Sequence, residues 1–87
     1  MSDLHIAGCV AFVRPEAVAG VVASIRASGL AEVPRHDPGG KLVILIEGPS
    51  AARVLNAMDA IRALDGVLAV HLAYQHAESE SEMQEDA

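Results

Sequence analysis

Aromatic residues are scarce in this 87-residue sequence, which has one Phe, one Tyr and no Trp. RNA-recognition domains stack bases on aromatic side chains of their strands, so the scarcity argues against that class of protein. Cysteine is equally scarce, because Cys9 is the only one. An intramolecular disulfide, a cysteine-cluster metal site and an iron–sulfur cluster are thereby excluded. Cys9 lies in an apolar run, so we expect a buried, unreactive thiol.

Long apolar runs and an excess of positive charge are also missing. No window of about 18 apolar residues occurs, which argues against a membrane span, and the N-terminus lacks the pattern of a secretory signal. We therefore expect a cytoplasmic protein. The net charge of −6 arises mainly in residues 78–87, which hold five acids and no base. Residues 1–77 hold seven acids and six bases, so we expect no positive surface for nucleic acid.

Apolar patterns over residues 1–77 predict one small domain, and residues 78–87 are predicted to form a disordered acidic tail. Strands are expected at 4–13, 30–36, 41–47 and 67–76. Pro34 marks the second of them as an edge strand. A first helix opens at Pro15 and stops at Gly29, with a buried face formed by Val18, Val21, Val22 and Ile25. A second helix is capped by Ser50 and ends at Asp65-Gly66.

The element order βαββαβ and a faint repeat of Gly29–Val33 in Gly66–Val70 predict an α+β, ferredoxin-like split βαβ fold. Right-handed crossovers place both helices on one face of a four-stranded antiparallel sheet of order 4-1-3-2. The other face is left uncovered, and an apolar sheet face in water needs a partner.

Alternation along two strands predicts which side chains line that uncovered face. In the last strand we assign the bulkier set to the helix side, namely Leu68, Val70, Leu72 and Tyr74. This assignment leaves Ala69, His71, Ala73 and Gln75 outward. In the first strand both alternating sets are apolar, so either set fits the uncovered face. In both cases small or apolar residues occupy its middle, which suits a docked helix or peptide.

No catalytic or metal-ligating constellation is apparent. His71 and His76 point to opposite faces of a strand, and although His5 and His71 fit neighbouring positions, no carboxylate or thiol spacing joins them. The Asp37–Lys41 segment predicts a hairpin turn rather than a phosphate loop, because no helix follows it. Ser50 lacks a paired His and Asp, and no carboxylate pair is placed for acid–base chemistry. We expect no enzyme, no cofactor and no metal site.

Three segments, Ile6–Glu16, Gly40–Glu47 and Asp65–Tyr74, resemble the NapD family, and the last is the most specific. The resemblance implies a ferredoxin-like chaperone that binds the twin-arginine signal peptide of the periplasmic nitrate reductase precursor (NapA). It also implies that export is delayed until the molybdenum cofactor is inserted, and that the peptide docks on the uncovered sheet face. The candidate contacts on the sheet and at its rim are Ile6, Gly8, Val10, Phe12, Ala69, His71, Ala73, Glu32 and Glu47.

Several alternatives stay open from the sequence. The acidic tail is either a solubilising end or a second contact for the arginines of the peptide. A small-ligand, amino-acid-binding regulatory domain of the same topology is the competing function, although the Arg14-Pro15 turn is too short and stiff to wrap a ligand. Weak self-association through the sheet, and an interaction module for another protein, are the remaining alternatives.

Overall fold

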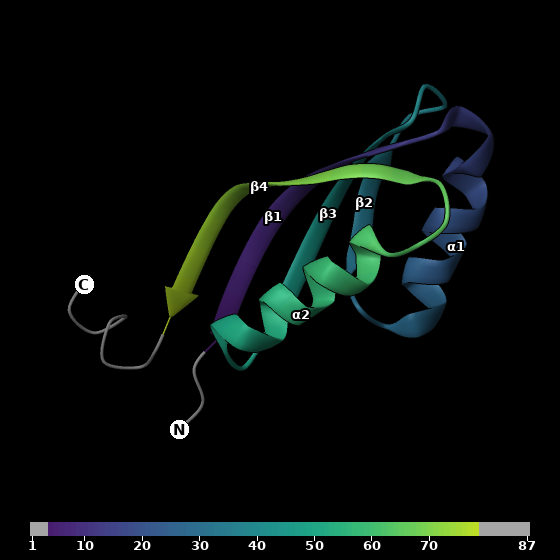
Figure 1. The fold of residues 1–87 in the computed structure, drawn as a ribbon. Helices are drawn as coiled ribbons and strands as arrows, with labels where there is room; N and C mark the ends of the chain where they lie inside the picture. Colours follow the sequence, from purple (N-terminus) through teal and green to yellow (C-terminus); the bar gives the residue numbers. More distant parts are fainter. Residues whose placement is uncertain (1–3, 79–87) are drawn as a thin grey trace.

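The computed structural model describes residues 4–78, which form a four-stranded sheet and two helices (Figure 1). The elements are β1 (Leu4–Val13), η1 (Pro15–Ala17), α1 (Val18–Ser28), β2 (Glu32–His36), β3 (Lys41–Gly48), α2 (Ala51–Arg62) and β4 (Val67–Glu78). The sheet order is β2-β3-β1-β4, and all neighbouring strands are antiparallel. The expected βαββαβ arrangement is confirmed. The predicted acidic tail, apart from Glu78 at the end of β4, lies outside the described residues.

Local signals in the sequence place the end of α1 and the start of α2, whereas α2 ends at Arg62, before the predicted stop at Asp65-Gly66. Pro15 opens the 3-10 turn η1, and α1 continues from it until Gly29, whose φ of 72° ends the helix. The Ser50 hydroxyl accepts a hydrogen bond of 3.2 Å from the backbone N–H of Arg53 and caps α2. The first turn is 3-10 rather than α-helical, so the predicted helix from Pro15 is divided into η1 and α1.

One hydrophobic core lies between the sheet and the two helices. Its largest fully buried side chains are Ile25, Leu42, Ile44, Ile46, Ile61 and Val54. The strand β1 contributes smaller ones, namely Ala7, Cys9, Ala11 and Val13, each at most 2% exposed. Burial raises the pKa of the Cys9 thiol above its ordinary value, with a smaller opposing effect of the Arg62 charge. The buried thiol predicted for Cys9 is confirmed.

The turn between β2 and β3 packs against the end of β1. Gly40 adopts a φ of 114°, and a Cβ there would overlap the carbonyl oxygen of Val13, so only glycine fits. The N–H of Val13 donates to the Gly40 carbonyl at 2.7 Å. One carboxylate oxygen of Asp37 accepts from the N–H groups of Lys41 and Gly40, and these bonds lower the pKa of Asp37. The hairpin turn predicted here is confirmed.

Candidate functional site

The sheet surface turned away from the helices is called the open face below. Residues paired across antiparallel strands share a face, so each set of residues paired across the sheet forms one row of the open face. From one end to the other, the β1 residues of the open face are Ile6, Gly8, Val10 and Phe12, and their β3 partners are Glu47, Leu45, Val43 and Lys41. Their β4 partners are His76, Tyr74, His71 and Ala69. The structure thus brings together the four β1 candidates, which the sequence left undecided between two faces.

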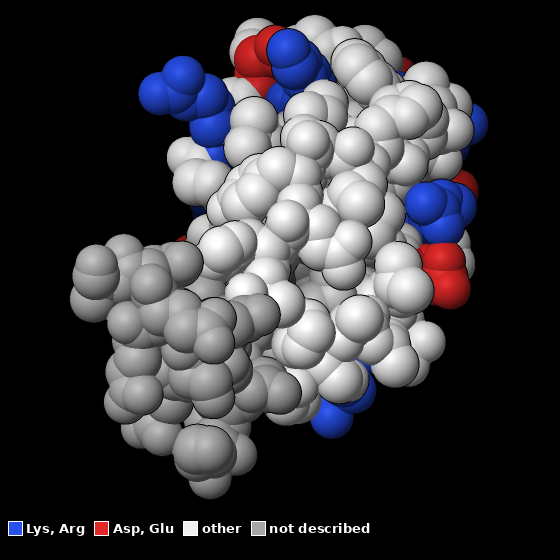
Figure 2. Space-filling model, turned by 90° about the vertical axis from the view of Figure 1, so that its left-hand side faces the viewer, with Lys and Arg blue, Asp and Glu red and all other residues white. Residues whose placement is uncertain are grey.

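Large apolar side chains are exposed mainly on β1 and β4, the two strands at one edge of the sheet. Six are exposed among the residues whose burial is described, and five of them lie on β1 or β4: Leu4, Phe12, Leu68, Leu72 and Tyr74. Figure 2 views the molecule from the side where β4 and β1 lie, and shows an uncharged surface at the centre with charged residues toward the margins. The sixth, Leu55, lies on α2. Such clustering is typical of a surface that binds a partner.

The assignment of Tyr74 to the helix side is wrong. The pairing of β4 with β1 shifts between Gly8 and Cys9, because Cys9 pairs with Leu72 and Gly8 with Tyr74. The extra residue, Ala73, forms a β-bulge, which inverts the alternation beyond it and bends the strand (Figure 1). Tyr74 therefore shares the open face with Gly8. Gln75, predicted to point outward, instead pairs with the buried Ala7.

The Tyr74 ring occupies the space above Gly8. A Cβ on Gly8 would lie 2.6 Å from Cδ1 of Tyr74 and would overlap Cε1 as well. The ring is about half covered, since Tyr74 is 52% exposed. The contact between Tyr74 and Gly8 was not predicted from the sequence, although a glycine inside a strand often marks the close approach of another group. Tyr74 places a phenol ring on the open face of β4, in the row next to Ile6 and His76.

The candidates on β4 occupy different positions. Ala69 is half-buried beside Phe12, and His71 pairs with Val10. The rings of His71 and Phe12 meet edge to face, with centroids 5.9 Å apart. Ala73 is exposed at the bulge. His5 pairs with Ala77 rather than with His71, so the two histidines suggested as neighbours are separated along the sheet.

The rim acids lie at one end of the open face. Glu32 pairs with Leu45 and Glu47 pairs with Ile6, and both line one hollow with Leu45. At the other end, Arg35 pairs with Val43 and Lys41 with Phe12. All four charged side chains are exposed. Within the described part of the chain, none of the four forms an ion pair.

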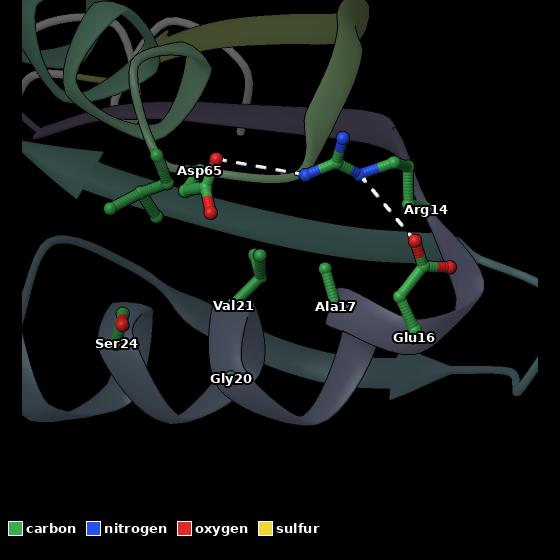
Figure 3. A pocket seen from close by; sticks show the side chains of 8 residues that line it. Arg14, Glu16, Ala17, Gly20, Val21, Ser24 and Asp65 are labelled. Carbon is green, nitrogen blue, oxygen red and sulfur yellow. Dashed lines mark ion pairs between the residues drawn. The ribbon is translucent and has the colours of Figure 1, made fainter.

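A second hollow lies on the helix side, between α1 and the loop after α2 (Figure 3). Arg14 reaches across it toward two carboxylates, with its Nε 3.7 Å from Glu16 and its Nη2 3.6 Å from Asp65. These ion pairs are exposed and screened by water, so they contribute little to stability. The two acids surround the Arg14 charge, so the hollow lacks the unbalanced charge that would attract an anion. Its small neighbours Ala17 and Gly20 do not add a reactive group.

Metal-holding clusters and membrane-spanning helices are two further kinds of site that the described residues can be examined for. Residues 4–78 contain no group of three or more His, Cys, Asp or Glu side chains arranged to hold a metal ion. Over the same residues, no helix has the length and hydropathy to cross a membrane. The open face supplies an apolar surface with charged residues toward its ends.

Comparisons with known proteins support the fold described above. The model of the NapD protein family matches residues 4–79. Among solved structures, the solution structure of the E. coli Tat proofreading chaperone protein NapD is similar, with a TM-score of 0.76 and 26% sequence identity. That likeness covers 88% of this chain and 81% of the E. coli chain. None of the curated proteins matches the sequence.

Proposed function

Since the chain belongs to the NapD family, we propose that it is a cytoplasmic chaperone for the twin-arginine signal peptide of a periplasmic nitrate reductase precursor. The structurally similar E. coli protein is described as a Tat proofreading chaperone. In this proposal the chaperone holds the signal peptide until the molybdenum cofactor has been inserted, and it catalyses no reaction itself. The peptide docks on the open face.

The observation that carries the proposal is the exposure of Phe12 and Tyr74 on the open face of β1 and β4, whereas the exposed Leu72 pairs with the buried Cys9 at the edge of the sheet. A twin-arginine signal peptide has a basic start followed by an apolar segment. Such a segment binds favourably as an amphipathic helix on an apolar surface, because helix and surface remove each other's apolar area from water. The middle rows of the open face are uncharged on β3 and β1, with Leu45 and Val43 beside Gly8 and Val10. An apolar helix therefore meets no buried charge there.

A matched pair of truncations tests where the peptide binds. Phe12 is 43% exposed on the open face, and Leu55 is 50% exposed on α2. Phe12→Ala should weaken binding of a synthetic signal peptide about tenfold, as expected for an aromatic side chain that anchors an interface. Leu55→Ala removes a similar apolar side chain from the opposite side and should leave the dissociation constant unchanged. Isothermal titration calorimetry measures both.

Backbone amide shifts give an independent test of the surface. On titration with the same peptide, the largest changes should fall on β1, β3 and β4, and smaller ones on the exposed turns of α1 and α2. Shifts confined to the helices would contradict docking on the open face. The chaperone role itself fails if the protein captures the nitrate reductase precursor equally well after its signal peptide has been removed.

A further inference from the structure

We propose that the open face sets the direction of the bound signal peptide: its basic N-terminal segment lies over Glu32 and Glu47, and its C-terminal end lies toward Arg35 and Lys41. This inference rests on the proposed function and adds a polarity to it. The bound helix then runs in the same direction as β1, from Ile6 toward Phe12.

The charges of the open face are separated along the strands. The acids occupy the rows of Ile6 and Gly8, and the bases occupy the rows of Val10 and Phe12. Phe12 lies six positions beyond Ile6 along β1, which is about 20 Å of strand. A helix of about 13 residues has the same length, so one bound helix reaches both charged ends. On β3 and β1 the surface between Glu47 and Lys41 is apolar, and on β2 Glu32 and Arg35 lie in neighbouring rows with the same order of charge.

Neighbouring charges weaken the difference in charge between the two ends of the open face but do not cancel it. Arg53 lines a hollow beside Glu47 from α2, but Glu32 has no basic residue in the hollow that it shares with Glu47 and Leu45. At the opposite end Asp37 lies near Lys41, and its carboxylate already accepts the N–H groups of Gly40 and Lys41. Arg35 has no acidic partner within ion-pair distance among residues 4–78.

Two electrostatic effects favour the same direction. Arginines at the start of the peptide meet the acidic end, and each exposed charge pair of this kind changes affinity by about 1.4- to 5-fold. The helix dipole adds to this, because its positive N-terminus faces the acids and its negative C-terminus faces Arg35 and Lys41. In the reversed direction these attractions would be lost, and the arginines of the peptide would lie against Arg35 and Lys41. The preference between directions should therefore be on the order of tenfold or more at low salt.

Spin labels on the peptide measure the direction directly. A nitroxide at the N-terminal end should broaden the amide signals of Glu32, Glu47 and Ile6. A nitroxide at the C-terminal end should broaden those of Lys41 and Phe12. The reversed pattern, or equal broadening at both ends by each label, would overturn the inference while leaving the chaperone role intact. Absence of binding would instead overturn the proposed function.

Charge variants supply the second arm. The double change Glu32→Gln and Glu47→Gln should weaken binding about 5- to 10-fold at low salt, and the loss should vanish for a peptide whose two arginines are replaced by glutamine. The control double change Glu16→Gln and Asp59→Asn alters the net charge equally on the helix side and should have no effect. Equal losses in both variants would show that net charge, not the rim acids, governs binding, and would overturn the inference.

Discussion

Replacing Gly8 with alanine tests the packing that shapes the open face. A glycine inside a strand is ordinarily less stable than alanine by about 0.5–1 kcal/mol, because it loses more conformational freedom on folding. At this position the substitution meets the Tyr74 ring, whose Cδ1 would lie 2.6 Å from the new Cβ. The ring must swing away from the sheet. The usual gain in stability from replacing glycine is therefore opposed by the loss of contact between the ring and the sheet.

The exposed fraction of Tyr74 limits the size of that loss. A fully buried aromatic side chain covers about 150–250 Å². With Tyr74 52% exposed, about 100 Å² is covered, and at ~25 cal/mol per Å² its complete release costs at most about 2.5 kcal/mol. Partial release costs about 1–2 kcal/mol, so Gly8→Ala should be destabilising by up to about 1 kcal/mol. When Tyr74→Ala has already removed the ring, the same change should stabilise by about 0.5–1 kcal/mol.

Urea unfolding of the four proteins in this double-mutant cycle measures the effect. The sign of the Gly8→Ala change should reverse when Tyr74 is absent, with a coupling energy of about 1–2 kcal/mol. If Gly8→Ala changes the free energy of unfolding by the same amount in both backgrounds, the ring does not lie above Gly8. The bulge at Ala73, which turns Tyr74 toward Gly8, would then be refuted as well.

Three further predictions concern the fold. Cys9 is buried and its pKa is raised by burial, so a thiol reagent should react slowly with native protein and rapidly in denaturant; fast native labelling would contradict this. Ser50→Ala removes the cap of α2 and should lower the free energy of unfolding by about 1 kcal/mol in urea titrations, whereas Ser50→Asp should preserve it. Hydrogen bonds from backbone N–H groups lower the folded pKa of Asp37, so its contribution to stability is present above the unfolded pKa and is lost as the pH falls through the folded pKa. Asp37→Asn should therefore reduce the fall in the free energy of unfolding at acid pH. An unchanged fall in the variant would count against these hydrogen bonds.

The sequence by itself determined the elements and their order. Gly29 and Ser50 mark helix ends through local backbone and side-chain chemistry, so no tertiary information is needed to place them. The periodic Val18, Val21, Val22 and Ile25 predict the buried face of α1, and all four are buried. In the order βαββαβ, each helix connects two strands of the sheet. Because such crossovers are right-handed, few arrangements of the strands remain possible. The ferredoxin-like sheet order follows from these local signals.

Only the tertiary structure decided which side chains form the open face. Both alternating sets of β1 are apolar, and the smaller set lies under the helices because the large Ile and Leu side chains of β3, α1 and α2 already fill that core. The bulge at Ala73 depends on how β4 pairs with β1, and alternation along β4 alone cannot locate it. The same pairing places Tyr74 on Gly8, and the β2–β3 register separates the acids from the bases. Contacts between strands, which no single segment contains, therefore set the shape and polarity of the surface.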